Sequence, residues 1–223
     1  MQNKVNIKEI FTSIQGEGPY VGYNQLFIRF SKCNLHCKYC DTDFNTSLKE
    51  YTDIELANIV NSTENIHSVS LTGGEPLCDT EFLQEFLPLV QKKVYLETNG
   101  TLPDDLRKVI QHIDIVAMDI KLNSCSKMGD LFEKHKDFIL VAIKECREIF
   151  IKIIFDENIT DDEINNTIEL AKEYNLLIVL QPKMNGDVLE IQPEKIYEIY
   201  SKFNTNYDNV RLIPQVHKFI NVQ

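Results

Sequence analysis

The stretch LFIRFSKCNLHCKYC, residues 26–40, joins a short apolar run to a loop that holds three of the six cysteines of the chain. Its first part, LFIRF, has the composition of a buried β-strand. Its second part places Cys33, Cys37 and Cys40 in the spacing C-x3-C-x2-C. A buried strand that ends in polar or reactive groups recurs along the chain, and this recurrence predicts the fold.

Six further apolar runs share the character of LFIRF. They are SVSLTG (68–73), KVYLET (93–98), DIVAMD (114–119), IFIKIIF (149–155), LIVLQP (177–182) and NVRLIP (209–214). Nearly continuous apolar runs are typical of strands that are covered on both faces. Helical patterns lie between several runs, and two of them begin with capping-box spacing, at Thr52 with Glu55 and at Thr160 with Glu163.

Strands that alternate with helices predict βα units and a parallel sheet. About six parallel strands are too few for a closed eight-stranded barrel. We therefore expect one α/β domain over residues 1–223, shaped as a partial, TIM-like barrel with helices outside, in which residues 1–25 form an N-terminal extension. Functional groups of such folds gather at the carboxyl ends of the strands. Polar motifs stand at five of these ends: SKCNLHC, TGGEP, ETNG, MDIK and QPK.

The charge of the chain excludes some partners. Lysine and arginine number 23 and aspartate and glutamate number 34, which gives a net charge of −11. Nucleic acids and anionic membranes would be repelled, so we expect neither as a partner. No run approaches the ~18 apolar residues of a membrane span, and the first residues lack the apolar core of a signal peptide. We expect a cytoplasmic protein, in which clustered cysteines indicate metal or redox chemistry rather than disulfides.

Three closely spaced thiolates favour zinc, copper(I) or an iron–sulfur cluster. A structural zinc site would need a fourth ligand, and the other cysteines, Cys78, Cys125 and Cys146, are single. A cubane cluster explains the missing ligand, because three thiolates hold three irons and leave one iron open to another molecule. Three unrelated buried thiols, or a zinc-binding or electron-carrying module, are the alternatives without catalysis.

The C-x3-C-x2-C loop after the first predicted strand resembles the signature of the radical S-adenosylmethionine enzymes. The resemblance implies a [4Fe-4S] cluster on Cys33, Cys37 and Cys40. The open iron of this cluster is expected to bind S-adenosylmethionine, and an electron from the reduced cluster is expected to cleave it and form a 5′-deoxyadenosyl radical. TGGEP, residues 72–76, resembles the glycine-rich segment of that family. Gly73 and Gly74 are then expected beside the amino group of S-adenosylmethionine, with Glu75 ordering the loop, whereas a plain strand-to-helix turn is the alternative.

The resemblance implies five further cofactor contacts. They are Tyr39, near the adenine, and Gly100, Asp119, Lys121 and Gln181. A packed loop aromatic is the alternative for Tyr39, and a solvated side chain is the alternative for Lys121. The segment MDIKLNSCSKMGD, residues 118–130, departs from the commoner Ser-Pro-Lys form and resembles glycyl-radical activases. An activase that acts on a partner protein is therefore an alternative function.

Motifs near the two ends of the chain favour a different branch of the radical S-adenosylmethionine enzymes. SIQGEG (13–18), FIRF (27–30) and QVHK (215–218) resemble the 7-carboxy-7-deazaguanine synthase family. The resemblance implies a lyase that converts 6-carboxy-5,6,7,8-tetrahydropterin to 7-carboxy-7-deazaguanine with loss of ammonia, on the route to 7-deazapurines such as queuosine. It also implies a homodimer that receives electrons from a reductase or a flavodoxin.

Site residues are implied by the same resemblance. Substrate contacts are expected from Ile14, Gln15, Gly16, Glu17, Arg29, Thr98, His217 and the terminal carboxylate of Gln223. Glu17 and His217 are expected to be catalytic, and Thr42 is expected to bind Mg²⁺. The planar guanidinium of Arg29 suits bidentate bonding to a carboxylate. Taken singly, Arg29 could be a surface strand residue, His217 an ordinary histidine and residues 15–18 a plain turn.

Overall fold

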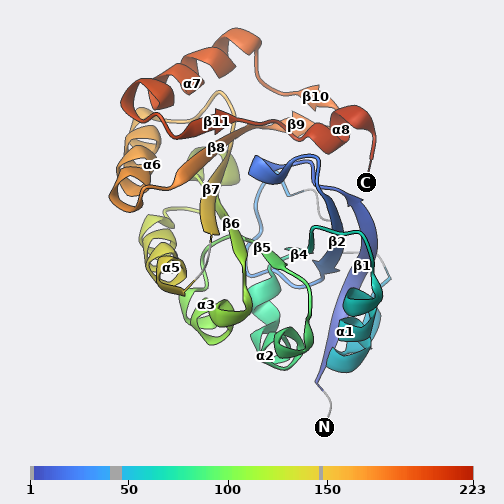
Figure 1. The fold of residues 1–223 in the computed structure, drawn as a ribbon. Coiled ribbons are helices and arrows are strands. Elements are labelled where there is room, and N and C mark those ends of the chain that lie inside the picture. Colours follow the sequence, from blue (N-terminus) through green and yellow to red (C-terminus); the bar gives the residue numbers. More distant parts are fainter. Residues whose placement is uncertain (1–2, 41–46, 146–147, 223) are drawn as a thin grey trace.

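The fold is described from a computed structural model, which covers residues 3–40, 47–145 and 148–222. One large sheet has the strand order β11-β8-β7-β6-β5-β4-β2-β1-β3. Its parallel strands are β2 (Asn24–Phe30), β4 (Ser68–Gly73), β5 (Val94–Thr98), β6 (Ile115–Ile120), β7 (Glu148–Phe155), β8 (Leu177–Pro182) and β11 (Val210–Leu212). In the described part of the chain the edge strands β11 and β3 do not pair, so the sheet is a curved, partial barrel (Figure 1).

The predicted strands are confirmed. All seven apolar runs form the parallel strands, and β4 and β8 have the predicted bounds. Every residue of β6 is buried, as expected of a strand between two neighbours with both faces covered. NVRLIP, one of the seven predicted runs, forms β11 beside β8, so the described residues hold seven parallel strands where about six were expected for the partial barrel.

The N-terminal extension is mostly a long strand, which the sequence reading missed. β1 (Lys4–Ile14) pairs antiparallel with β2, and β3 (Lys49–Thr52) pairs antiparallel with β1. Val5 and Ile7 are buried while Lys4 and Asn6 are exposed. This alternation is the pattern of a strand with one covered face, and a search for continuous apolar runs overlooks it.

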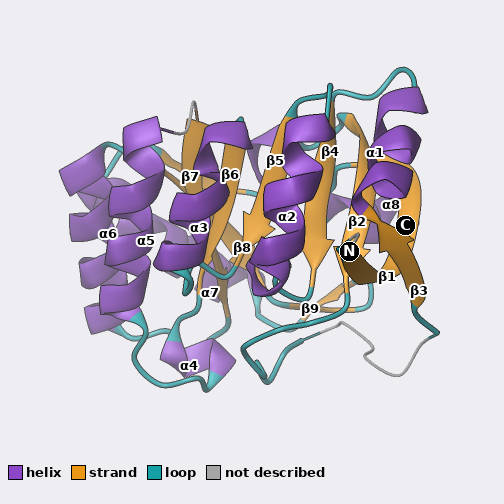
Figure 2. Ribbon diagram, turned by 90° about the horizontal axis from the view of Figure 1, so that it is seen from below, coloured by secondary structure: helices purple, strands orange, loops and turns teal. Residues whose placement is uncertain are grey.

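Helices cover the outer face of the sheet, as predicted (Figures 1 and 2). They are α1 (Asp53–Ser62), α2 (Thr80–Phe86), α3 (Pro103–Val109), α5 (Phe132–Glu145), α6 (Asp161–Tyr174) and α7 (Pro193–Asn206). The short α4 (Asn123–Ser126) lies apart from them beside the cysteine loop, where the amide of Lys38 donates to the carbonyl of Ser126 at 3.0 Å (Figure 2). Both predicted capping boxes are present, with Thr52 accepting from the backbone of Glu55 and Thr160 from that of Glu163. Between these helices and the sheet lies a continuous apolar core. No helix in residues 3–40, 47–145 or 148–222 is long and apolar enough to span a membrane.

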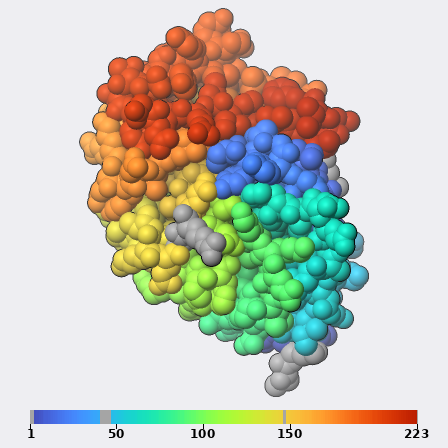
Figure 3. All heavy atoms as spheres, in the orientation of Figure 1, coloured from blue at the N-terminus to red at the C-terminus, as the bar shows by residue number. Residues whose placement is uncertain are grey.

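The loop that follows β1 meets the C-terminal segment, although the first residues of β1 lie far from it (Figure 1). The short strands β9 (Met184–Asn185) and β10 (Val188–Leu189) and the last helix, α8 (Val216–Ile220), belong to the C-terminal segment. The backbone amide of Val216 donates to the carbonyl of Gly16 at 2.9 Å. Figure 3 shows this contact as the red C-terminal surface lying directly against the blue N-terminal surface.

Candidate active site

A cavity of about 260 Å³ opens at the carboxyl ends of the parallel strands. Fifteen of the predicted site residues line it: Ile14, Gln15, Gly16, Glu17, Arg29, Cys33, Cys37, Tyr39, Cys40, Gly73, Gly74, Thr98, Asp119, Lys121 and His217. They come from both chain ends, from the cysteine loop and from four strands. Residues that are up to about 200 positions apart in sequence therefore face one space.

Three predicted residues do not line the cavity. Glu75 and Gln181 are buried. Gly100 has φ +65°, and a methyl group there would lie 2.6 Å from Cε of Met118, so its packing and its backbone both require glycine. Thr42 and Gln223, like Cys146, lie outside the described residues.

The cysteine loop follows β2, as predicted. Cys33 and Cys37 are half-buried and Cys40 is exposed, and all three border the cavity. Burial raises the pKa of the Cys33 and Cys37 thiols. Within the described residues, no three His, Cys, Asp or Glu side chains converge closely enough to hold one metal ion. A [4Fe-4S] cubane requires a different arrangement of the cysteines, because each one binds its own iron. The three sulfur atoms then lie around the whole cluster and need not converge on a single ion.

Glu75 joins the loops that follow β4 and β5. Its carboxylate is buried and accepts hydrogen bonds from the backbone amides of Asn99 at 2.7 Å and Leu77 at 3.2 Å, and from Thr98 Oγ1 at 2.9 Å. Burial raises the pKa of Glu75 to about 7, although these three donors oppose the rise. The hydroxyl of Thr98 is thus already engaged within the protein, and it also accepts from the amide of Gly100 at 3.2 Å.

Asn99 extends this network to the cysteine loop. Its Nδ2 donates to Oδ1 of Asn34 at 2.8 Å, and Nδ2 of Asn34 donates to Oγ1 of Thr101 at 2.8 Å. Asn34 lies directly after Cys33 in the sequence. On the far side, the buried His135 of α5 lies with Nε2 3.1 Å from the carbonyl of Asn99. The cysteine loop is therefore fixed to the end of β5 by side-chain amides.

The paired glycines of TGGEP are required by packing of the chain on itself. A methyl group on Gly74 would lie 2.6 Å from the carbonyl carbon of Lys32, and one on Gly73 would lie 2.6 Å from the carbonyl oxygen of Phe30. Gly73 also has φ +102°, which favours glycine. Because Lys32 precedes Cys33, the close approach brings the glycine loop against the cysteine loop.

Four charged side chains alternate in sign along the inner face of the cavity. Lys152 of β7 pairs with Glu17, and its Nζ lies 3.7 Å from Oδ2 of Asp119. Nζ of Lys121 lies 2.9 Å from the same oxygen of Asp119. All four side chains are between 12% and 16% exposed. Lys121 is therefore not solvated, and its Nζ lies 5.2 Å from the centre of the Tyr39 ring.

Charge pairing sets the ionisation of this chain of residues. Burial opposes the charge on Glu17, but Lys152 and the hydrogen bond from Gln215 outweigh it and lower the pKa of Glu17 to about 2. Burial likewise opposes the charge on Lys152 and on Lys121, while Glu17 and Asp119 raise the pKa values of the two lysines above the ordinary value. Glu17 and the two lysines are thus charged at neutral pH.

Gln15 ties the N-terminal extension to the sheet. Its Nε2 donates to Oε1 of Glu97 at 2.9 Å and to Oε1 of Gln25 at 3.0 Å, and its Oε1 accepts from the amide of Glu17 at 3.0 Å. Thr72 Oγ1 donates to the other oxygen of Glu97 at 2.7 Å. The amide of Gln15 is therefore used within the protein, where it fixes the loop that carries Glu17.

Arg29 stands at the other side of the cavity, on β2. Its Nε lies 3.1 Å from Oε2 of Glu9, the residue opposite it on β1, and its guanidinium lies 5.7 Å from the centre of the Phe11 ring. Phe11 stacks on Phe27 at 5.2 Å between ring centres. An arginine held through Nε presents its two terminal nitrogens as a fork, the geometry that binds a carboxylate in bidentate fashion.

Several site residues were missed by the sequence reading. Lys152, Glu97, Asn99, Thr72, Lys183 and Gln215 line the cavity. A lysine inside the apolar run IFIKIIF was the available signal for Lys152, since an unpaired charge would not remain in a buried strand. Glu97 and Asn99 lie in the motif ETNG and Thr72 lies in TGGEP, but the sequence analysis predicts no role for these three residues. Glu9 gave no signal, because only the register of β1 on β2 brings it to Arg29.

The residues present fit the predicted cofactors. Three thiols border the cavity beside a glycine loop, and soft thiolates suit an iron–sulfur cluster. Among the described residues, Oδ1 of Asp119 and Oε1 of Gln181 are buried without a hydrogen-bond partner. An unpaired buried acceptor costs free energy, so Asp119 at the cavity wall has capacity for a polar ligand.

Known proteins resemble the chain over almost its whole length. Residues 27–176 match the radical SAM superfamily. The chain is 37% identical to the 7-carboxy-7-deazaguanine synthase of Geobacter sulfurreducens, with 96% of each chain covered. It is 35% identical to the synthase of Archaeoglobus fulgidus, with 99% of this chain and 100% of that one covered. The crystal structure of QueE from Escherichia coli has a TM-score of 0.65 at 20% identity, covering 96% of this chain and 95% of that chain.

Proposed function

Because the chain belongs to the radical S-adenosylmethionine superfamily and, within it, to the 7-carboxy-7-deazaguanine synthase family, we propose that its cavity converts 6-carboxy-5,6,7,8-tetrahydropterin to 7-carboxy-7-deazaguanine with loss of ammonia. One observation carries the proposal for the site. The cysteine loop, the Gln15–Glu17 loop, Arg29 and His217 border the same cavity. The chain is similar to 7-carboxy-7-deazaguanine synthases over nearly its full length. We therefore reject the alternative functions, namely a glycyl-radical activase and a zinc-binding or electron-carrying module.

The cofactor half of the cavity is assigned to the cysteine loop and its neighbours. Cys33, Cys37 and Cys40 would hold a [4Fe-4S] cluster. Gly73, Gly74, Tyr39, Asp119 and Lys121 would contact S-adenosylmethionine, while Glu75, Gly100 and Gln181 support that half from behind. When bound, the cluster and S-adenosylmethionine supply one-electron reduction and a carbon-centred radical that abstracts hydrogen. The protein orients the reacting groups and excludes water.

The substrate half is assigned to the meeting point of the chain ends. Arg29 would bind the substrate carboxylate with its two terminal nitrogens, because Glu9 already occupies Nε. Ile14, Gly16, Thr98 and His217 would contact the pterin, while Gln15 acts by fixing the loop. Glu17 is ionised by its pairing with Lys152, so it would accept hydrogen bonds or a proton from the pterin ring.

Further parts of the proposal concern what lies around the site. Thr42 would contribute a hydroxyl to Mg²⁺, and Gln223 would contact the substrate. We also propose that the chain acts in the cytoplasm as a single domain within a homodimer, and that a reductase or a flavodoxin supplies the electron. One neutral hydroxyl is a weak magnesium ligand, so binding of Mg²⁺ should require the substrate.

The experiment is a product assay. The protein is reconstituted with iron and sulfide without oxygen, reduced, and incubated with S-adenosylmethionine, Mg²⁺ and carboxytetrahydropterin. We expect 7-carboxy-7-deazaguanine and ammonia in equal amounts by mass spectrometry and an ammonia assay. Cleavage of S-adenosylmethionine without any deazaguanine would leave a radical enzyme but refute the assigned substrate.

A further inference from the structure

A buried lysine, Lys152, borders the cavity and has no role in the proposed function. Lys152 is in β7, where Phe150, Ile151, Ile153 and Phe155 are buried. Its side chain is only 12% exposed and borders the cavity. Burying a lone ammonium costs several kcal/mol, so its partners must account for its presence.

Two carboxylates face the ammonium of Lys152. Glu17 comes from the N-terminal loop and pairs with it directly, and Asp119 comes from β6 with Oδ2 3.7 Å away. Glu97 of β5 adds a more distant negative charge. Asp119 has a second cation in Lys121, at 2.9 Å. Glu17 therefore depends on Lys152 more than Asp119 does.

The surroundings of Glu17 lead to the same conclusion. Its other oxygen, Oε1, accepts from Nε2 of Gln215 at 2.7 Å. His217 of α8 also lowers the pKa of Glu17, but less than Lys152 does. Tyr95 of β5 is buried, and the negative charge of Glu17 contributes to raising the pKa of its hydroxyl. Gln215 carries no charge, so Lys152 is the strongest source of positive potential at this carboxylate among the described residues.

We propose that Lys152 is a positioning residue for the reaction, which holds Glu17 as a carboxylate and fixes the direction of its oxygens in the cavity. This inference rests on the proposed function, because Glu17 is one of its catalytic residues. Removing the ammonium leaves a buried carboxyl group beside a neutral amide, and burial then favours the protonated acid. A protonated Glu17 could not take up a proton from the pterin ring, and it would accept hydrogen bonds from that ring more weakly than a carboxylate does.

A purely structural role makes a different prediction. The Lys152–Glu17 pair joins β7 to the N-terminal loop, so its loss could merely loosen the loop and lower turnover equally at every pH. A role in ionising Glu17 instead adds a pH dependence. The shape of the pH profile separates the two roles, because loosening alone introduces no new ionisation.

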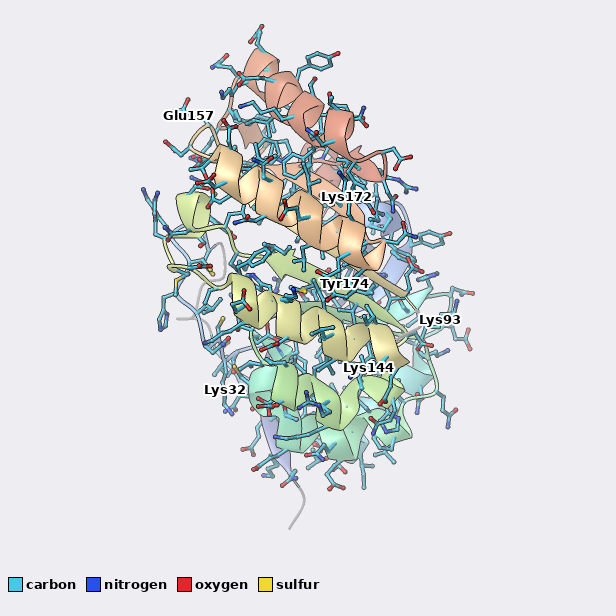
Figure 4. All side chains as sticks on the ribbon, turned by 90° about the vertical axis from the view of Figure 1, so that its left-hand side faces the viewer. Lys32, Lys93, Lys144, Glu157, Lys172 and Tyr174 are labelled. Carbon is cyan, nitrogen blue, oxygen red and sulfur yellow. The ribbon has the colours of Figure 1, made fainter. Side chains whose placement is uncertain are left out.

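The test uses the reconstituted holoenzyme and compares the wild type with Lys152→Met, Lys152→Arg and the control Lys144→Met. Lys144 is exposed on α5, in the outer helical layer (Figure 4). The kcat/KM for deazaguanine formation is measured from about pH 5.5 to about pH 9. We expect Lys152→Met to gain an acidic limb, along which kcat/KM falls about tenfold per pH unit. Lys152→Arg should keep the wild-type shape, and Lys144→Met should match the wild type.

A Lys152→Met profile that superimposes on the wild type after scaling would overturn the inference. If circular dichroism shows that this variant does not fold, Lys152→Gln replaces it with the same two outcomes, because the amide can still bond to Glu17 without a charge. A wild type that forms no deazaguanine refutes the proposed function and this role with it. A productive wild type with parallel profiles refutes the role of Lys152 alone.

Discussion

Gly16 and His217, near opposite ends of the chain, are packed so closely that no side chain fits between them. A methyl group on Gly16 would lie 2.5 Å from Cβ of His217 and 2.6 Å from Cγ. The carbonyl of Gly16 also accepts from the amide of Val216. The substrate half of the cavity is therefore assembled by this contact between the first loop and α8.

Gly16→Ala should displace α8 together with His217. We expect a loss of about 1–3 kcal/mol of unfolding free energy from overpacking. Turnover should fall about 10²-fold, as a misplacement near 1 Å can do. Gly22→Ala is the control, since Gly22 has φ +94° but meets no atom within 4 Å. It should lose stability through backbone strain and retain its turnover per folded molecule. Equal turnover in both variants would show that the position of α8 is irrelevant.

Glu9→Gln tests how Arg29 is held. The neutral amide binds Nε of Arg29 more weakly, so the guanidinium fork is less fixed. We expect KM for the carboxytetrahydropterin to rise about 3- to 10-fold, the effect of weakening one partly exposed charge-assisted bond, with little change in kcat. Glu50→Gln, which breaks the exposed Lys4–Glu50 pair between β1 and β3, should leave KM unchanged. A fall in kcat alone would contradict this reading of Arg29.

His135 should make the chain less stable in mild acid. Burial lowers the pKa of His135 to about 4 from an ordinary 6.5, so the folded state holds the neutral ring. This stabilisation is complete above pH 6.5 and is lost as the pH falls toward 4. Urea unfolding of the cluster-free chain should show a loss of roughly 2 kcal/mol from His135 between pH 7 and pH 5. His135→Gln should remove that part of the pH dependence of the unfolding free energy. If the pH dependence does not change, His135 is either already neutral in the unfolded chain or charged in the folded one.

Cys37→Ala should prevent assembly of the cluster. Anaerobic reconstitution should load about four irons on the wild type and close to none on this variant. Cys125→Ala is a matched control, because Cys125 is buried in α4 and does not border the cavity. It should load as much iron as the wild type. Full loading of Cys37→Ala with unchanged colour would remove Cys37 from the ligand set.

Much of this architecture could be predicted because it depends on local patterns. The continuous apolar runs gave the parallel strands, and the polar motifs at their ends located the cavity, while the family resemblance gave residues 14–17, Arg29 and His217. β1 escaped detection because its one-sided burial produces alternation instead of a run. The run NVRLIP predicted β11, but the pairing of β11 with β8 is a long-range property that no local pattern gives.

The partners within the site could not be predicted in the same way. The Lys152–Glu17 pair and the Glu9–Arg29 pair join residues that only sheet register and chain-end contacts bring together. The use of the Gln15 amide within the protein depends on Gln25 and Glu97, on different strands. A motif thus identifies which residues matter, while the folded chain decides which of them contact ligands and which hold the others in place.

The central claim is that the cysteine half and the substrate half of the cavity serve one reaction. Carboxytetrahydropterin that carries deuterium at C6 tests it most directly, in reduced, reconstituted protein with S-adenosylmethionine. Mass spectrometry of the 5′-deoxyadenosine formed should show one deuterium transferred from the pterin, in step with deazaguanine formation. Unlabelled 5′-deoxyadenosine beside unchanged, fully deuterated pterin would show that the radical does not reach this substrate and would contradict the account.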